Sequence, residues 1–299
     1  MNTEYLQFRI ISLLARGLPR PLVYSIGAGL SDALFRGQPT VAAAIAANHR
    51  RIREFQGAPA TDRELARLAR QTYRAFSRHL VDFFRFQQIS PRQVRRLMTV
   101  EGLANFDLAL ARGKGALGVS AHFGSWELSL ATVKALGYPM HVVVLPMKDP
   151  RTDALFEGVR RRHSLSLIPL GASLRPLLQA LRSREMVALV GDIDYSMHTE
   201  LVPIFGAPAR MPTGAARLAV RTGTPIVVVI LHQRPRGRYL MRVHTPIFPD
   251  PESTVDAVEA RVVRLLEREI LEDPTQWFAL FDYWNVEASL ALSREAAGP

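Results

Sequence analysis

Residues 115–128 hold the side chains whose types and spacing best suit catalysis. The segment reads GALGVSAHFGSWEL, and four residues separate His122 from Glu127. A carboxylate that hydrogen-bonds one imidazole nitrogen fixes the tautomer, and the other nitrogen can then accept a proton from a hydroxyl. This spacing alone is a weak signal, because without further context a capping or surface role for the two side chains explains it better.

The local pattern favours a catalytic position for His122. The apolar run 116–120 predicts a strand, and a helix is expected to start near Ser125. Ligand sites in parallel α/β sheets lie outside the carboxyl ends of the strands, which is where His122 falls. Gly124 would let another backbone approach closely. Helix amides and a nearby arginine could stabilise a developing oxyanion.

The elements that must position this loop form two regions. Residues 1–99 are expected to be a helical, membrane-facing region packed on a catalytic α/β region, 100–299. Helices are predicted over 3–15, 21–35, 40–55 and 61–88, then over 126–136, 153–162, 174–181, 213–221 and 254–271; strands are predicted over 116–120, 141–145, 165–169, 186–190, 225–231 and 239–243. Apolar runs that alternate with helices indicate a mostly parallel sheet flanked by helices.

Composition narrows the function classes. The chain has 38 Lys and Arg against 27 Asp and Glu, a net charge of +11, and no cysteine. The absence of cysteine excludes disulfides, thiolate catalysis and cysteine-ligated metal sites. No pair of histidines stands at ligand spacing beside a carboxylate, so no metal is expected. The basic charge suits an anionic partner, but no zinc-finger, RNP or helix-turn-helix signature supports a nucleic acid.

The N-terminal segment is the part of the chain that bears on whether the protein binds a membrane. It lacks the features of a secretory signal, and no segment reaches the roughly 18 apolar residues of a spanning helix. Leu6, Ile10, Leu13 and Leu14 follow a spacing of three to four residues, which predicts an amphipathic helix. Such a helix either packs on its own domain or lies on a membrane, and the sequence leaves both interpretations open.

The histidine segment, taken with several others, carries a family resemblance. His122 and Glu127 resemble the HX4(D/E) motif of the lysophospholipid acyltransferase superfamily. Within it, residues 22–284 are similar to the lipid A late acyltransferases, the lauroyl and myristoyl transferases, and to relatives that acylate other glycolipids. The supporting stretches are VR at 159–160 with LIP at 167–169, GDID at 191–194, VPIFGAPA at 202–209 and PTG at 212–214.

The resemblance implies a glycerolipid acyltransferase-like fold and a role for each matching residue. His122 would be the general base and Glu127 its orienting carboxylate. Arg160 would bind or polarise the thioester or a substrate phosphate, unless it lies on a solvated helix face. The remaining residues expected to contact or shape the substrate site are Asp192, Asp194, Gly124, Phe205 and Gly206. A turn or a helix cap would equally explain the two aspartates.

The implied reaction moves a fatty acyl chain from acyl carrier protein, or from acyl-CoA, to a hydroxyl of a membrane glycolipid. No cofactor is expected beyond this acyl donor, and an acidic carrier protein suits a basic enzyme. A lipid A precursor is the first expected acceptor and a phosphatidylinositol mannoside the second. The sequence is also compatible with a non-catalytic membrane-binding relative or with a thioester hydrolase. The expected location is the cytoplasmic face of the bacterial inner membrane.

The C-terminal residues 282–285, DYWN, replace the basic ending usual in that family. This departure falls where the acceptor would be selected. It leaves the identity of the acceptor open and affects the expected chemistry less.

Overall fold

The computed structural model describes residues 3–87, 89–171, 173–195 and 200–297, and it is helical up to Leu97. The first five helices are α1 (Thr3–Gly17), α2 (Arg20–Arg36), α3 (Pro39–Phe55), α4 (Asp62–Arg85) and α5 (Pro91–Leu97). Helix α4 begins at a capping box in which Thr61 and Glu64 bond reciprocally. Pro21 stands in the first turn of α2, where its missing N–H costs no helical bond. Both helix starts agree with the sequence prediction.

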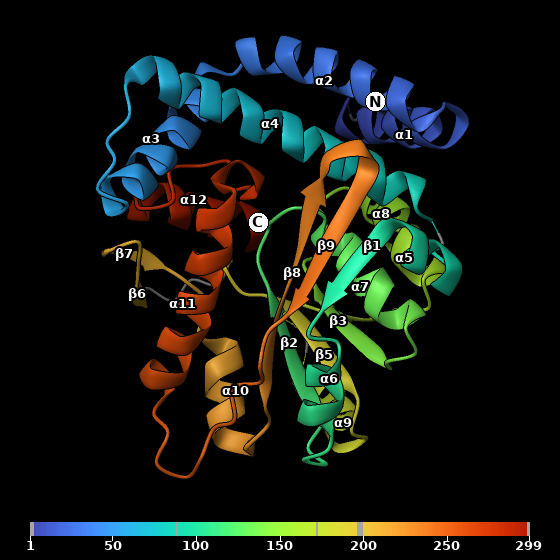
Figure 1. Ribbon diagram of the computed structural model, residues 1–299, viewed down its shortest axis with the longest axis vertical. Coiled ribbons are helices and arrows are strands. Elements are labelled where there is room, and N and C mark those ends of the chain that lie inside the picture. The colour runs from blue at the N-terminus through green and yellow to red at the C-terminus, as the bar shows by residue number, and fades with distance from the viewer. Residues whose placement is uncertain (1–2, 88, 172, 196–199, 298–299) are drawn as a thin grey trace.

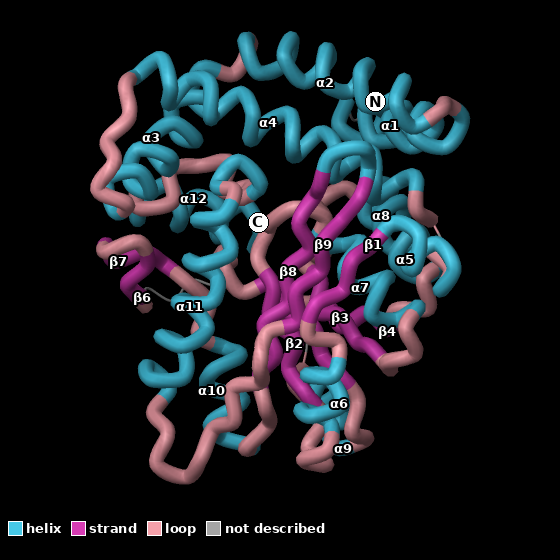
Figure 2. The backbone as a smooth tube through the Cα atoms, in the orientation of Figure 1, coloured by secondary structure: helices cyan, strands magenta, loops and turns pink. Residues whose placement is uncertain are grey.

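A seven-stranded sheet forms the centre of the chain, in the order β1-β9-β8-β2-β5-β3-β4 (Figures 1 and 2). Its strands are β1 (Met98–Glu101), β2 (Ala116–Ser120), β3 (Met140–Val144), β4 (Ser166–Pro169), β5 (Met186–Val190), β8 (Ile226–Arg234) and β9 (Arg238–Val243). All neighbouring pairs are parallel except the hairpin of β8 and β9, which the short 3-10 turn η1 (Pro235–Gly237) joins. The chain is therefore α/β with a mostly parallel sheet, as predicted.

The other elements cover the sheet or extend from it. They are α6 (Ala104–Leu110), α7 (Trp126–Ala135), α8 (Pro150–Arg162), α9 (Arg175–Arg182), α10 (Gly214–Thr222), α11 (Val255–Glu272), η2 (Pro274–Gln276) and α12 (Val286–Ala297), with a separate ribbon of β6 (Leu201–Ile204) and β7 (Ala207–Arg210). The sequence prediction missed β1 and this ribbon. Four-residue strands without a long apolar run give too weak a pattern to be recognised.

Burial on both faces explains the continuous apolar strands. In β8, Ile226, Val228 and Ile230 pack in the core beneath α10 and α11, while the alternate residues pack in the core beneath α6 and α7. Successive side chains of a strand point to opposite faces, so both sets must be apolar. Each fully buried side chain of this size contributes about 1.5–3 kcal/mol by leaving water.

The first four helices lie at one end of the sheet. Figure 1 shows α2 and α4 across the end toward which the β8 arrow points. Because β2, β5 and β8 run in the same direction, their carboxyl ends meet beneath these helices. None of the described helices is both long and apolar enough to cross a membrane.

A buried ion pair attaches α12 to the rest of the chain. The guanidinium of Arg210 is fully buried, and its Nη2 lies 3.1 Å from Asp194 Oδ2. Its Nη1 donates to the hydroxyls of Ser289 and Ser293 on α12, at 3.1 and 3.2 Å. A buried charge is tolerated only when it is paired and hydrogen-bonded, so this arginine fixes where α12 packs.

We expect Arg210→Ala to lower the free energy of unfolding by about 3–5 kcal/mol, because it leaves the Asp194 carboxylate buried without its main counter-charge. Urea denaturation followed by circular dichroism measures this change. The control is Arg217→Ala, which removes an exposed partner of Glu200 and should cost about 0–1 kcal/mol. Equal losses in the two variants would contradict the role given to Arg210.

Candidate active site

The imidazole of His122 lies against the carboxylate of Asp192. Its Nδ1 is 2.8 Å from Asp192 Oδ1, and the His122 backbone N–H donates to both carboxylate oxygens at 3.1 Å. An ionised carboxylate can only accept, so Nδ1 carries the hydrogen and Nε2 keeps its lone pair. The His122 side chain is 20% exposed, whereas the Asp192 side chain is fully buried. This arrangement presents a partly accessible, basic Nε2 whose orientation the protein fixes.

Strand register brings these two residues together. The neighbouring parallel strands β2 and β5 pair Ser120 with Val190 at their carboxyl ends. His122 and Asp192 each stand two residues beyond that pair, and hence on adjacent loops at the same edge. The site thus forms where sites of parallel α/β sheets are found, outside the carboxyl ends of the strands.

Two aromatic side chains hold Asp192 in place. The indole Nε1 of Trp277 donates to Asp192 Oδ2 at 2.9 Å, and the hydroxyl of Tyr283 donates to the Asp192 backbone oxygen at 2.5 Å. Burial raises the pKa of Tyr283 well above its ordinary value, so its hydroxyl keeps its proton. The Trp277 donor, together with those of His122, compensates for the removal of the carboxylate from water, and Tyr283 fixes the Asp192 backbone. Trp277 and Tyr283 therefore act on His122 through Asp192.

Glu127 does not contact the imidazole as the sequence prediction expected. It stands in the first turn of α7, and its Oε1 lies 2.6 Å from Arg160 Nη2 at the end of α8. Burial alone would lower the pKa of Arg160, but the Glu127 carboxylate outweighs it and raises that pKa. Both side chains are nearly buried, at 9% and 13% exposure. The orienting position expected for Glu127 thus belongs to Asp192, and Glu127 and Arg160 pair with each other.

Stacked rings form one wall beside His122. The Trp126 ring meets the His122 ring edge-on, with centroids 5.2 Å apart. Trp126 also stacks against His79 of α4, with ring centroids 3.6 Å apart and 14° between the ring planes. Burial lowers the pKa of His79 well below its ordinary value and keeps this imidazole neutral. The stack connects the helical region to the loop that carries His122.

Gly124 gives the loop its tight approach to the sheet. Its φ is +57°, and a Cβ there would lie 2.0 Å from the Leu231 oxygen of β8. The Gly124 N–H donates to the Gln276 oxygen at 2.8 Å. The expected close approach is thus to the protein's own backbone.

The other predicted residues lie around the Trp277 side of the site. Phe205 and Gly206 form the two-residue turn of the β6–β7 ribbon with φ of +49° and +72°. Such a turn needs positive φ at both positions. The Phe205 ring is buried, and its centroid lies 6.2 Å from that of the Trp277 ring. The Phe205 backbone N–H donates to Glu267 Oε1 at 2.6 Å. Asp194 lies in the buried pair with Arg210 and thereby supports α12.

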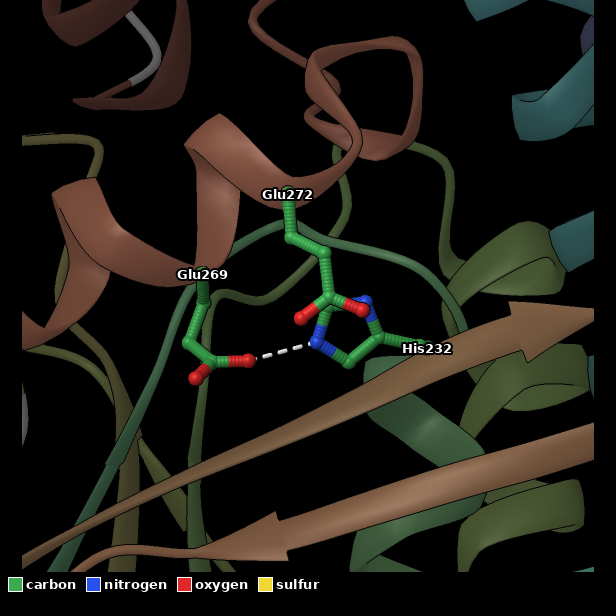
Figure 3. A group of neighbouring side chains, drawn as sticks. All are labelled: His232, Glu269 and Glu272. Atoms are coloured by element: carbon green, nitrogen blue, oxygen red, sulfur yellow. Dashed lines mark hydrogen bonds and ion pairs between the residues drawn. The ribbon is translucent and has the colours of Figure 1, made fainter.

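One group within the described residues has the donor types of a metal site. His232 of β8 and Glu269 and Glu272 of α11 place one ligand atom each within 4.8 Å of one another (Figure 3). However, Arg242 Nη1 lies 3.1 Å from Glu269 and also binds Glu272, so a cation already occupies the position between the carboxylates. His244 approaches the second oxygen of Glu269 at 3.1 Å. We interpret this cluster as a partly buried ion network that joins α11 to the β8–β9 hairpin.

The sequence reasoning missed Trp277 and Tyr283 as supports of the site, and it missed the His79 stack. Trp277 carried a signal, since a tryptophan next to an aromatic residue, at 277–278, agrees with the family resemblance. His79 carried none, because a lone histidine within an amphipathic helix is an ordinary core residue.

Known proteins match most of the chain. Residues 4–285 match the family described as bacterial lipid A biosynthesis acyltransferase. A phosphatidylinositol mannoside acyltransferase of Mycobacterium tuberculosis is 28% identical over 74% of this chain and 71% of its own length. A phosphatidylinositol mannoside acyltransferase of Mycolicibacterium smegmatis is 24% identical over 92% of this chain and 90% of its own length.

Two further comparisons concern a relative named for lipid A and a solved structure. The lipid A biosynthesis palmitoleoyltransferase of Escherichia coli is 25% identical over 62% of this chain and 60% of its own length. The crystal structure of a 1-acyl-sn-glycerophosphate acyltransferase from Thermotoga maritima covers 85% of this chain and 99% of its own, with a TM-score of 0.39 and 17% identity.

We expect the ion network around Glu269 to make stability depend on pH. Burial alone would raise the pKa of Glu269, but the hydrogen bond from His232 and the nearby His244 imidazole outweigh burial and hold that pKa well below its usual range. A lowered pKa in the folded state stabilises the protein above the ordinary value of about 4.3, and this stabilisation is lost as the pH falls below it. Glu269→Gln should therefore cost about 2–3 kcal/mol near neutral pH and less in acid.

Urea denaturation at several pH values measures the difference between wild type and variant. Glu252→Gln, at an exposed position, is the control and should leave stability unchanged at each pH. If the difference in free energy of unfolding between wild type and Glu269→Gln stayed constant as the pH was lowered into the acid range, the Glu269 carboxylate would not be the titrating group.

Proposed function

Because the chain belongs to the bacterial lipid A biosynthesis acyltransferase family and is thus an acyltransferase, we propose that it transfers a fatty acyl chain from a thioester to a hydroxyl of a membrane glycolipid. The observation that carries the mechanism is the fixed pairing of the His122 ring with buried Asp192. It leaves Nε2 as the only ring atom able to accept a proton. His122 acts as general base and Asp192 as the group that orients it.

The proposed reaction proceeds by direct attack. As the acceptor oxygen forms a bond to the thioester carbonyl carbon, its proton moves to His122 Nε2. The tetrahedral oxyanion then collapses, the C–S bond breaks, and the leaving sulfur takes the proton from the imidazolium. Acyl carrier protein and acyl-CoA are the donors to be tested. The chain has no cysteine, so an enzyme-bound thioester plays no part in the proposal.

The start of α7 offers stabilisation for the oxyanion. The side chain of Ser125 makes no capping bond at this end of the helix. The first helical N–H groups, beginning with Trp126, therefore lack that side-chain acceptor and lie only a few residues after the base. N–H groups at a helix start stabilise negative charge. The Glu127–Arg160 pair holds this helix against α8 and keeps its start beside the base.

A lipid surface would be met by α1 and α2. Their large exposed apolar side chains recur at helical spacing: Leu6, Ile10, Leu13, Leu22, Ile26, Leu30 and Leu34. Exposed apolar side chains gathered on adjacent helices mark an interaction surface. With a net charge of +11, electrostatic attraction to anionic headgroups adds to their burial. We place this surface at the cytoplasmic face of the bacterial inner membrane.

The comparisons leave two glycolipid acceptors to test. Relatives named for phosphatidylinositol mannoside match more of the chain than the relative named for lipid A, while the family's description names lipid A. The acceptor assay therefore includes a phosphatidylinositol mannoside beside the lipid A precursor expected first. The replacement of a basic C-terminal stretch by residues 282–285 is a further reason to test both.

We expect Asp192→Asn to reduce kcat about 100-fold or more, since an amide NH2 at that position favours the wrong imidazole tautomer. His122→Ala should reduce kcat at least as much. Glu127→Gln is the matched change, because it also converts a carboxylate to an amide. It should lower the thermal midpoint but reduce kcat less than Asp192→Asn does. Single-turnover acyl transfer and thermal unfolding measure both. A larger kcat loss in Glu127→Gln than in Asp192→Asn would refute the assignment of Asp192.

We expect acceptor-dependent release of thiol from acyl carrier protein or coenzyme A thioesters, with acylated glycolipid formed and neither seen in His122→Ala. The assay follows thiol release with each acceptor and with none. Equal release without acceptor would instead identify a hydrolase. No release from either donor would contradict the acyl-transfer proposal.

A further inference from the structure

A cavity of about 450 Å³ lies between helices α2 and α4 and the carboxyl end of β8. Its walls come from four segments far apart in the chain: Tyr24, Gly27, Ala28, Arg74, Ala75, Ser77, Arg78, Val81, Gln233, Arg234, Pro235, Asp273, Thr275 and Gln276. Three of these residues are arginines and one is acidic. The volume accommodates a phosphate with an attached glycerol or sugar.

Arg78 is the residue that marks this cavity as a binding site. Its Nη2 donates to the Arg234 backbone oxygen at 2.7 Å, and its guanidinium stands 5.1 Å over the Tyr24 ring. Its Nε–H is buried and has no hydrogen-bond partner within the described residues. A buried donor without an acceptor is costly, and a charged one especially so. The guanidinium is therefore held in a defined plane beside the cavity, and its buried Nε–H has no acceptor within the described residues.

The other charged side chains of the cavity already have partners. Arg74 makes a two-pronged ion pair with Asp32, and Arg234 pairs with Glu272. The carboxylate of Asp273 accepts hydrogen bonds from the residues of the turn that follows it, at 3.2 and 2.8 Å. The charges of these three groups are therefore already compensated without a ligand.

Arg78 differs from them, because it forms no ion pair within 4.0 Å in the described part of the chain. Asp82 is a carboxylate that interacts with it electrostatically from beyond that distance. The Asp82 carboxylate is itself bonded by Arg20 and Tyr24, and burial raises its pKa. An anion that enters the cavity would thus meet one guanidinium without a direct counter-ion, flanked by two that have one.

We propose that this cavity binds the phosphate of a phosphate ester, with Arg78 as the anchoring residue. A planar guanidinium that lines the cavity without a direct counter-ion among the described residues matches phosphate oxygens in geometry and in charge. The exposed apolar side chains Leu22, Ile26 and Leu30 lie on the same helix as the cavity residues Tyr24 and Ala28. The cavity therefore adjoins the helix that carries the proposed lipid surface.

The cavity is separate from the His122 site but is joined to its loop. Gln233 lines the cavity, and its Nε2 donates to the Gly124 oxygen at 3.2 Å. The same nitrogen donates to the Ala75 oxygen of α4 at 3.2 Å. Headgroup binding would thus act on the loop that carries the base.

Two probes distinguish the sources of the phosphate. Glycerol 1-phosphate, titrated by calorimetry, reports a free ester, and vesicles of phosphatidylcholine with or without phosphatidylglycerol report a lipid headgroup. We expect Arg78→Gln to weaken binding about tenfold or more, because it removes the charge-assisted bonds. Arg78→Lys should recover part of the loss, since it keeps the charge without the planar donors. Ala28→Phe should weaken binding by filling the cavity with the charge unchanged.

Arg67→Gln is the matched control, because it removes the same charge from an exposed position on α4. His122→Ala should bind both probes like wild type. A failure of the acyl-transfer proposal can therefore be distinguished from a failure of the phosphate-binding proposal. Thermal midpoints confirm that each variant is folded. Binding only to phosphatidylglycerol vesicles, lost in Arg78→Gln and Ala28→Phe, supports a lipid headgroup. Binding that these variants leave unchanged, or no binding of either probe, would overturn the proposal.

Discussion

The Asp192 carboxylate is fully buried, and the rest of the site is arranged around the need to compensate its charge. Its donors come from the loop after β2 and from the segment after η2, and Tyr283 fixes its backbone. An unpaired charge in this position would cost several kcal/mol, so these segments must pack together whenever the chain is folded. The geometry of the proposed active site and the folding stability therefore depend on the same hydrogen bonds.

The Trp277 indole connects this carboxylate to a second layer of packing. Its ring lies against those of Phe205, Tyr283 and Trp284, which come from the β6–β7 turn and from the C-terminal segment. The neighbouring pair of Asp194 and Arg210 attaches α12 to the same region. Aromatic rings offer large buried area with few rotatable bonds, which suits a wall that must keep one donor aimed at one oxygen. Packing sets the shape of this wall, and His122 and Asp192 lie at its border.

The first four helices present different chemistry on different sides. Their outer surface exposes apolar side chains of α1 and α2, and their inner surface places His79 against Trp126 beside the base. Between the two lie the arginines that line the cavity near β8. One helical layer thus links a surface suited to lipid with the loop that carries His122. This arrangement gives the proposed membrane surface a direct mechanical connection to the site.

Features that depend on neighbouring residues could be predicted from the amino-acid order. Apolar runs predicted the main strands, the helix predicted over 61–88 begins within one residue of α4, and the position of His122 after a predicted strand indicated the candidate catalytic loop. The predicted partner of that histidine was wrong, because Glu127 is near in sequence whereas Asp192 is 70 residues away. Only the pairing of β2 with β5 brings Asp192 to the imidazole, and strand order is a long-range property that local periodicity does not encode. Tertiary packing likewise decided that Glu127 faces Arg160, since a helix's rotation is set by what its faces pack against.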